Sequence, residues 1–245
     1  MILLEAQNLV KRYGGRAVVD HVSLTVGQGE IVGLLGRNGA GKTTTFRMTI
    51  GMIPPNEGTV GFEGVDVTHM PMYRRARRGL GYLSQEPSIF HRLTVRKNLL
   101  AILETMKLSR RQRRQRCDQL LEQFGLGHVQ DQLARTLSGG ERRKLEIARA
   151  LVTNPTMILL DEPFSGVDPI AVEDLQGEIR GLKDRGISIL LTDHNVRETL
   201  TVTDRSYIID NGKVLREGPP RDLINDELVR KTYLGHTFRG DEFDR

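Results

Sequence analysis

Three short segments of the chain are almost wholly apolar and show no alternation of apolar and polar positions. They are "IVGLLG" at 31–36, "MILLD" at 157–161 and "ISILLTDH" at 187–194. Apolar runs of this kind are typical of strands buried on both faces, as in a parallel sheet. Polar or glycine residues end or follow each run, at the edge where open α/β sheets gather ligand-binding loops. The pattern therefore predicts a parallel sheet with a ligand site at one edge.

Two longer segments repeat their apolar residues at the spacing of an amphipathic helix. These residues are Val95, Leu99, Ile102 and Met106 in 94–107, and Val172, Leu175, Ile179 and Leu182 in 169–184. Near the start, "VVDHVSLTV" alternates more loosely, which indicates antiparallel strands, and "DNGKVLREG" at 210–218 indicates a hairpin with an Asn-Gly turn.

The order of these elements predicts an α/β fold in a single domain, 1–245. Its core is formed by 1–85 and 155–245, with an antiparallel β subdomain at the N-terminus. A mostly helical insert, 86–154, interrupts that core. Because there are no internal repeats and no low-complexity segments, nothing indicates a second, repeated unit.

Composition fits a globular chain, since 38% of the 245 residues are hydrophobic and 27% are charged. No apolar run approaches the ~18 residues of a membrane span. The start, "MILLEAQN", reaches Glu5 too soon for the core of a signal peptide. The lone cysteine, Cys117, excludes an internal disulfide and fits a reducing compartment. We expect a packed thiol in a cytoplasmic protein.

The mild net charge of +5 is unevenly distributed. Arginines gather in "YRRARR" at 73–78 and in "SRRQRRQR" at 109–116, where Ser109 and Gln112 can form a capping box. We favour a solvated helix face over a nucleic-acid site for the second run, because no aromatic residues are interleaved to stack on bases. No nucleic-acid partner is therefore expected, and contact with anionic lipid headgroups stays open.

The segment "GRNGAGKT" at 36–43 lies between a predicted buried strand and a helical pattern. It fits G-x-x-x-x-G-K-[ST], in the context that a phosphate-binding loop requires. Its glycines let backbone amides surround the phosphates of a nucleotide. Lys42 is placed to reach the β- and γ-phosphates, and Thr43 to offer its hydroxyl to Mg²⁺.

Polar residues at the ends of other predicted strands supply the rest of a hydrolytic site. Asp161 ends a buried strand and can hold Mg²⁺, while Glu162 beside it can orient or deprotonate an attacking water. Gln85 follows a further short strand and can bridge Mg²⁺ and water. A lone histidine is more often structural, but His194 ends a buried strand at the same edge, which favours a contact with the γ-phosphate.

The segment "TLSGGERRK" at 136–144 predicts a second anion site, at the start of a helix. Ser138 can cap that helix and Glu141 can complete a capping box. Gly139 and Gly140 then occupy the first helical positions, although each glycine costs about 1 kcal/mol relative to alanine inside a helix. Glycines beside unpaired amides allow close approach of an anion.

Taken together, these motifs resemble the ATP-binding-cassette ATPases, in the same order and over nearly the whole chain. Residues 36–43 match the family's Walker A motif, Gln85 its Q-loop, 137–141 its signature motif and 157–161 its Walker B motif. The resemblance implies an ATPase with a P-loop core of the cassette type.

The same resemblance implies a role for each matching residue. Glu162 matches the catalytic glutamate, His194 the switch histidine, Asp168 the D-loop at the dimer interface, and Tyr13 the aromatic that stacks on adenine. Mg²⁺ would be held by Thr43, Gln85 and Asp161. The implied ATP-binding residues are Tyr13, Gly36, Arg37, Asn38, Gly39, Ala40, Gly41, Lys42, Thr43 and Thr44. In this family two copies dock head to tail, and Ser138, Gly139 and Gly140 bind the ATP of the partner.

Several stretches narrow the resemblance to one branch of the family. They are "SQEPSIFHRLTV", "DEPFSGVDPIAV", "LTDHNVRETLTV" and "RKTYLG". They resemble the ATPase subunits of bacterial lipopolysaccharide exporters, which pair with themselves at the cytoplasmic face of the inner membrane and drive two membrane subunits. ATPases of branched-chain amino-acid importers share much of the sequence of these stretches and remain the alternative. A repair ATPase is disfavoured, because the roughly fifty residues between Gln85 and Ser138 are too few for its coiled-coil arm.

The loop after Gln85 is expected to contact the membrane subunits. In the family that the chain resembles, this region lines a groove that receives a short helix from each of them. We therefore predict that Phe90 is exposed, with His91 and Arg92 at the rim of the groove, and that Pro87 limits the freedom of the loop. The alternative for Phe90 is burial in the core, as is usual for large aromatic residues.

Overall fold

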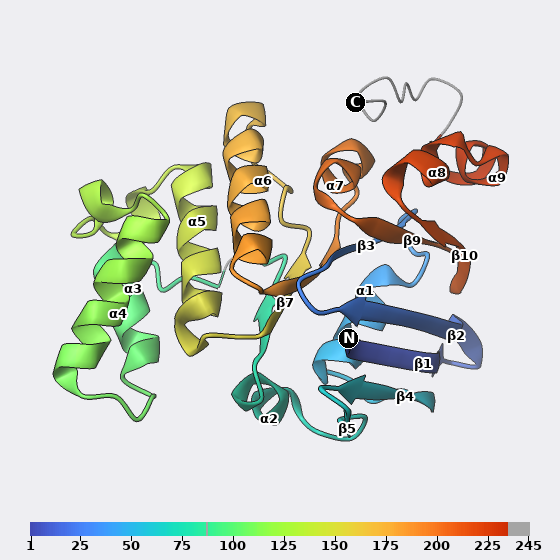
Figure 1. Ribbon diagram of the computed structural model, residues 1–245, viewed down its shortest axis with the longest axis horizontal. Helices are drawn as coiled ribbons and strands as arrows, with labels where there is room; N and C mark the ends of the chain where they lie inside the picture. The colour runs from blue at the N-terminus through green and yellow to red at the C-terminus, as the bar shows by residue number, and fades with distance from the viewer. Residues whose placement is uncertain (87, 235–245) are drawn as a thin grey trace.

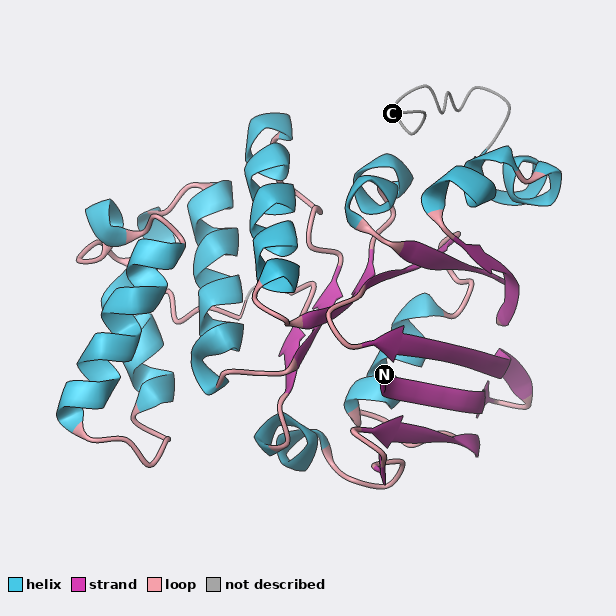
Figure 2. Ribbon diagram, in the orientation of Figure 1, coloured by secondary structure: helices cyan, strands magenta, loops and turns pink. Residues whose placement is uncertain are grey.

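The computed structural model describes residues 1–86 and 88–234 and consists of two sheets and a block of helices (Figure 1). Pro87 and the final segment "RGDEFDR" lie outside the described residues. Figure 2 shows strands on one side of the molecule, and on the other a group of helices that contains α3, α4 and α5.

The larger sheet has six strands in the order β10-β9-β3-β8-β7-β6. Five of them are parallel to their neighbours, and only β10 is antiparallel. The strands are β3 (Ile31–Gly36), β6 (Leu80–Leu83), β7 (Met157–Asp161), β8 (Ser188–Thr192), β9 (Arg205–Asp210) and β10 (Lys213–Gly218). Every residue of β3, β7 and β8 is buried. The three apolar segments are thus confirmed as strands of one parallel sheet.

The smaller sheet is antiparallel, as expected for the N-terminal part of the chain. Its order is β2-β1-β4-β5. Its strands are β1 (Ile2–Tyr13), β2 (Arg16–Gly27), β4 (Glu57–Phe62) and β5 (Val65–Asp66). The predicted hairpin at 210–218 is also confirmed, because β9 and β10 are joined by Asn211 and Gly212 with φ angles of 47° and 78°. Positive φ at both central residues is the signature of a type I′ turn.

The helices join or follow the strands of the two sheets, and those between β6 and β7 form a separate block. They are α1 (Lys42–Ile50), α2 (Met72–Arg77), α3 (Val95–Leu103), α4 (Arg110–Gln123), α5 (Gly139–Ala150), α6 (Pro169–Asp184), α7 (Val196–Val202), α8 (Pro220–Asn225) and α9 (Glu227–Val229). Short 3-10 turns lie at Gly127–Val129, Ala134–Thr136 and Leu151–Thr153, and a π-turn at Arg230–Leu234.

The predicted helices are found, with one change of boundary. Helix α6 has the predicted range, and its four periodic apolar residues are all buried. Helix α3 ends at Leu103, so Met106 lies beyond it and the predicted range 94–107 was too long. The amides of Thr105 and Met106 bond to carbonyls only three residues back, which tightens and ends the helix. Both capping boxes, Ser109–Gln112 and Ser138–Glu141, are present.

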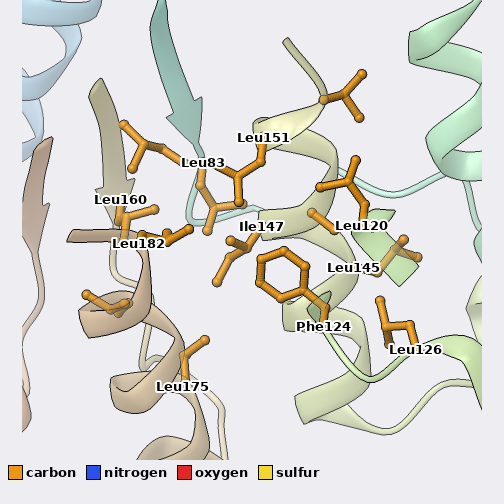
Figure 3. Close-up of a cluster of buried hydrophobic side chains, with 14 of the residues drawn as sticks. Leu83, Leu120, Phe124, Leu126, Leu145, Ile147, Leu151, Leu160, Leu175 and Leu182 are labelled. Carbon is orange, nitrogen blue, oxygen red and sulfur yellow. The ribbon is translucent and has the colours of Figure 1, made fainter. Parts of the chain in front are cut away.

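One apolar cluster joins the helical block to the larger sheet (Figure 3). Phe124 and Leu120 of the helical block meet Ile147 of α5, which in turn lies against the strands and α6. The labelled members are Leu83, Leu120, Phe124, Leu126, Leu145, Ile147, Leu151, Leu160, Leu175 and Leu182. Because this core is continuous, the division into 1–85, 86–154 and 155–245 stays a prediction.

The predicted packed thiol is confirmed. Cys117 is fully buried in α4, and burial raises the pKa of its thiol to about 11. A thiol that stays protonated at neutral pH is a poor nucleophile. Within 1–86 and 88–234, no helix is long and apolar enough to span a bilayer.

Candidate nucleotide-hydrolysis site

The loop between β3 and α1 has a backbone that only glycine suits at its last position. Gly41 has a φ angle of 107°, and a Cβ atom there would lie 2.7 Å from the carbonyl oxygen of Val18. Lys42 follows as the first residue of α1, and its Nζ donates to the carbonyls of Gly36 and Arg37 at 2.6 and 3.1 Å. The loop therefore curls around the ammonium group, as a phosphate-binding loop must.

The ammonium of Lys42 is mostly withdrawn from solvent. Burial lowers the pKa of Lys42, while the nearby carboxylates of Glu162, Asp161 and Asp193 oppose this by favouring the charged form. These carboxylates come from the ends of β7 and β8, so the loop and the acidic strand ends face one another. A buried cation with this acidic surrounding is suited to the anionic phosphates of a nucleotide and its metal ion.

Glu162, Gln85 and His194 come together although they lie far apart in the sequence. The Nε2 atom of Gln85 donates to Oε2 of Glu162 at 2.7 Å, and Nδ1 of His194 lies 3.4 Å from the same oxygen. Glu162 has a φ angle of 48°, which a residue with a side chain seldom adopts. Its amide is held by the carbonyl of Thr192 at 2.7 Å. Such strain is typical of functional positions.

Asp161 has the features of a metal ligand. Its carboxylate is buried, the hydroxyl of Tyr82 lies 3.3 Å from Oδ2, and Oδ1 has no hydrogen-bond partner in the part of the chain that the structure describes. Burial raises the pKa of Asp161. An orphaned carboxylate oxygen, together with the hydroxyl of Thr43 and the amide of Gln85, is an all-oxygen donor set that fits Mg²⁺. Among the described residues, no group of three or more histidine, cysteine or acidic side chains is placed to hold a metal ion.

Asp193 is a site residue that sequence reasoning missed. It is fully buried, and its carboxylate accepts the amides of Phe164 and Asn195, both at 2.9 Å. It thereby joins the loop after Glu162 to the loop that carries His194, and burial raises its pKa. The only signal in the sequence was an acidic residue at the end of the apolar run before His194.

Arg143 of α5 is a second residue that the sequence did not reveal. Its guanidinium is buried, forms an ion pair of 2.7 Å with Glu146, and donates to backbone carbonyls at 3.2–3.3 Å. These carbonyls belong to Ser84, Asp161, Glu162 and Pro163. The signature helix is thus bonded directly to the strand ends that carry Gln85 and Glu162.

The signature segment has a hydrogen-bond network of its own. The carboxylate of Glu141 accepts from the amide and the hydroxyl of Ser138 at 2.9 and 2.7 Å, and Nε2 of His128 lies 3.2 Å from its other oxygen. The bonds from Ser138 lower the pKa of Glu141. In Figure 1 the start of α5 lies on the far side of α6 from α1. The signature residues are therefore distant from the phosphate loop of their own chain.

The two signature glycines differ in their surroundings. A Cβ atom on Gly139 would meet nothing closer than the carbonyl oxygen of Gly166 at 3.8 Å, whereas one on Gly140 would lie 3.0 Å from Cβ of Ala171. Packing of α5 against α6 thus accounts for Gly140. Contacts within the described residues do not require a glycine at position 139.

The chain matches the family model described as ABC transporter over residues 19–165. It belongs to the ABC transporter family. It is 54% identical to the lipopolysaccharide export system ATP-binding protein LptB of Haemophilus influenzae, over 98% of this chain and 100% of the relative. The corresponding protein of Escherichia coli K12 is 53% identical over the same shares.

Solved structures give the same result. The ADP conformation of MJ1267, an ATP-binding cassette of an ABC transporter, has a TM-score of 0.87 and 31% identity, covering 96% of this chain and 99% of that one. A nucleotide-free cassette has a TM-score of 0.86 and 30% identity, with 96% and 100% covered. The predicted family, the cassette-type α/β fold with its antiparallel β subdomain, and ATP hydrolysis coupled to transport are thereby confirmed. A dimeric structure of the ATP-binding cassette MJ0796 bound to ADP and Pi has a TM-score of 0.78 and 24% identity, covering 89% of this chain and 99% of that one.

The remaining predicted residues lie at the surface. Tyr13, at the end of β1, is 51% exposed, and Nζ of Lys11 lies 5.6 Å from the centre of its ring. Asp168 caps α6, accepting the amide of Ala171 at 3.0 Å. Tyr13 is therefore not a core residue. The assignment of individual residues to ATP, to Mg²⁺ and to the dimer interface stays a prediction.

Phe90 is 46% exposed, as predicted, and its neighbours His91 and Arg92 are exposed too. The guanidinium of Arg149 lies 4.6 Å from the centre of the Phe90 ring. The side chain of Asn98 fixes the backbone of Phe90 by accepting its amide at 2.8 Å and donating to its carbonyl at 3.1 Å. Nearby, a groove is lined by Met72, Ala76, Tyr82, Ser88, Ile102 and Arg149.

Proposed function

We propose that two copies of this chain bind two ATP molecules between them and that hydrolysis powers bacterial lipopolysaccharide export. The observation that supports this proposal best is the near-complete match to two export-system ATP-binding proteins, together with the convergence of Gln85, Glu162 and His194. In this proposal two integral membrane subunits supply the path for the lipid. The chain would then lie at the cytoplasmic face of the inner membrane.

In this proposal the residues around the loop hold the nucleotide. The amides of 36–44 and the ammonium of Lys42 bind the phosphates, and the exposed ring of Tyr13 stacks on adenine. Thr43, Asp161 and Gln85 hold Mg²⁺, which when bound neutralises charge on the phosphate oxygens. Asp161 brings an oxygen that has no hydrogen-bond partner among the described residues, so coordination there replaces no existing bond.

Glu162 is the proposed general base. Its Oε2 atom accepts Gln85 in this structure, and it must exchange that partner for the attacking water. His194, 3.4 Å from the same oxygen, is placed to bind the γ-phosphate beside it. The strained backbone of Glu162 and the carbonyl bonds of Arg143 fix where the carboxylate can point. A base held in this way accelerates hydrolysis by positioning as well as by proton transfer.

The open surroundings of Gly139 support a second copy as the missing part of the site. Docked head to tail, Ser138, Gly139 and Gly140 of one chain would bind the γ-phosphate held by the loop of the other. A two-fold axis creates both composite sites from one self-complementary surface. Asp168, which caps α6, would lie in that interface. Nucleotide then joins the two copies, and its hydrolysis separates them.

Reconstitution tests the cargo. The chain should be purified from membranes with the hydrophobic subunits that accompany it and reconstituted in vesicles. We expect ATP-dependent release of lipopolysaccharide, abolished by Lys42→Ala. ATP-dependent uptake of leucine or isoleucine without lipopolysaccharide release would instead support the importer alternative. Recovery with nucleic acid in place of membrane subunits would contradict both.

A further inference from the structure

Six exposed arginines lie along one edge of the molecule. Three belong to α2 and the residue after it, and three to the first half of α4. They are Arg74, Arg77, Arg78, Arg110, Arg111 and Arg114. None of the six forms an ion pair within 1–86 and 88–234, although many other arginines of the chain do. In Figure 1, α2 and the connection from α3 into α4 both lie along the lower edge.

The arginines of α4 are placed where they stabilise the helix least. The N-terminus of a helix carries a partial positive charge, so acidic residues stabilise it and basic residues do not. The first turn of α4 contains no acidic residue, and its capping box uses the neutral Gln112. A solvated face that only kept α4 in water would be served better by glutamates. The arginines at this end are therefore explained by an anionic partner.

Helix α2 adds an aromatic residue to the same edge. Tyr73 is 56% exposed, and the guanidinium groups of Arg74 and Arg77 lie 5.9 and 5.7 Å from the centre of its ring. Because cations already sit against the only exposed ring of this patch, stacking of nucleic-acid bases on it is disfavoured. A tyrosine next to arginines is typical of the interface between a bilayer and water, where the ring is half buried and the charges meet headgroups.

The patch adjoins the groove next to Phe90. Met72 and Ala76 of α2 line that groove together with Arg149, and Ile102 of the groove belongs to α3, which leads into α4. If membrane subunits bind in this groove, as the family resemblance implies for the loop after Gln85, the arginines on either side of it face the bilayer. The signature end of α5 lies on the opposite edge in Figure 1, so the patch is free while two copies dock.

We propose that this edge, formed by Tyr73, Arg74, Arg77, Arg78, Arg110, Arg111 and Arg114, binds the anionic phospholipid headgroups of the bilayer. The surface contributes to holding the ATPase on the membrane and sets its orientation beside the groove. That this surface faces the membrane in the assembled transporter rests on the proposed function. That it binds anionic lipid does not depend on the proposed function. Attraction of this kind weakens as salt screens the charges.

Vesicle sedimentation with the full-length chain, without membrane subunits, tests the proposal. We expect binding to vesicles that contain phosphatidylglycerol, little binding to pure phosphatidylcholine, and loss of binding as NaCl is raised. Since each arginine near an anionic surface contributes about fivefold in affinity, Arg110→Gln, Arg111→Gln and Arg114→Gln together should weaken binding by roughly 100-fold. Arg74→Gln with Arg77→Gln should weaken it by roughly 25-fold on the same basis.

A matched control removes the same charge at the other end of the molecule. Arg16→Gln, Lys213→Gln and Arg216→Gln change exposed residues at the start of β2 and in β10, and should leave most vesicle binding intact. Equal loss in both triple variants would mean that net charge alone acts, and equal binding to neutral vesicles would exclude headgroup recognition. Either result overturns the proposal, as does tighter binding to a single-stranded oligonucleotide than to anionic vesicles.

A further measurement separates this surface from the proposed function. Phe90→Ala should bind anionic vesicles like the unmodified chain, since Phe90 carries no charge. The triple variant of α4 should keep its basal ATPase activity, because none of the three arginines contacts the site. If Phe90→Ala no longer assembles with the membrane subunits but still binds anionic vesicles, the results support both the proposed function and the lipid-binding surface. If the chain proves to drive a different transporter yet binds anionic vesicles through these arginines, only the proposed function fails.

Discussion

At the scale of single residues, Glu162 and Asp161 are adjacent in sequence but have opposite environments. Glu162 is bonded to Gln85 and lies beside His194, whereas one oxygen of Asp161 has no partner within 1–86 and 88–234. The first arrangement orients a base and the second leaves a coordination position open. The two carboxylates should therefore respond differently when each is replaced by its amide.

Glu162→Gln keeps the shape of the side chain and removes the base. We expect ATP hydrolysis to fall by ~10²–10⁴-fold, the usual effect of losing a positioned general base. ATP should still bind and should still hold two copies together, because the phosphate loop and the signature segment are unchanged. Phosphate release and sizing chromatography with ATP measure the two effects. Normal turnover, or a monomer in the presence of ATP, would remove Glu162 from this role.

Asp161→Asn should stabilise the chain without nucleotide and abolish Mg²⁺-dependent hydrolysis. Burial raises the pKa of Asp161, so the folded state holds its proton more tightly than the unfolded state does. The destabilisation by the charged form is thus absent below the unfolded pKa of ~3.8, develops as pH rises toward the folded pKa, and is complete above the folded pKa. Relieving an unpartnered buried carboxylate oxygen should contribute about 1–3 kcal/mol at neutral pH.

Thermal unfolding of the unmodified chain and of Asp161→Asn, from pH ~3.8 to pH ~7, measures the difference in their stability. The stabilisation by Asp161→Asn should be largest at pH 7 and shrink toward acid pH. An equal gain at every pH would mean that packing, and not charge, sets the stability of this position.

At the scale of elements, the two glycines at the start of α5 are predicted to have different roles. Gly140 is needed for packing in its own chain, and Gly139 for dimerisation. Gly139→Ala has room in its own chain, so its unfolding free energy should change by less than about 1 kcal/mol, while ATP-driven dimerisation weakens. Gly140→Ala would place Cβ 3.0 Å from that of Ala171, so it should lower stability before any nucleotide is added. Melting temperature and ATP-dependent dimerisation of the two variants give the comparison. A loss of monomer stability in Gly139→Ala would show that its own chain needs that glycine.

The loop between β6 and α3 provides a second prediction at this scale. Phe90→Ala removes a half-exposed ring and its contact with Arg149, worth about 0.5–1 kcal/mol at an exposed site. We expect the variant to fold and to bind ATP, but to lose assembly with the membrane subunits and transport. Val65→Ala, at another exposed apolar residue, is the matched control. A large drop in melting temperature without the subunits would instead place Phe90 in the core.

The site residues that were predicted from the sequence are positioned by residues close to them in the chain. Glu162 and Gln85 lie within two residues of the ends of β7 and β6, and Lys42 begins α1 after the glycine-rich loop that follows β3. Neighbouring residues in the chain therefore fix their positions. Arg143 was missed because its partners Asp161 and Ser84 lie 18 and 59 positions away. Such contacts depend on how α5 packs on the sheet, and no periodicity in the chain encodes that.

Arg75 shows the same limit within a charged run. The segment 73–78 looks uniformly solvated, yet Arg75 is 1% exposed. Its Nη1 atom donates to the carbonyls of Met48 and Thr49 in the last turn of α1. An arginine is favourable there because it satisfies helix-end carbonyls and the negative end of the helix dipole. Only the position of α2 against α1 distinguishes it from its exposed neighbours.

At the scale of the whole molecule, the phosphate loop and the signature segment lie apart in one chain (Figure 1). Each phosphate loop therefore needs a signature segment from another copy, if the proposed site is correct. Two copies related by a two-fold axis contain two such sites, and each site takes one half from either chain. A defect in one half can then be compensated by a partner whose defect lies in the other half.

Mixing two inactive variants tests this arrangement. Lys42→Ala disables the phosphate loop, and Gly139→Asp puts a negative side chain where the partner's γ-phosphate would lie. A mixed dimer has one site with both halves intact and one with both halves broken. If the chains exchange freely and the sites act independently, an equal mixture should recover up to about a quarter of the normal ATPase rate. Each variant alone should stay inactive, while Gly139→Asp monomers bind ATP normally. Loss of that binding, or a mixture as inactive as its components at every ratio, would mean that each chain completes its own site.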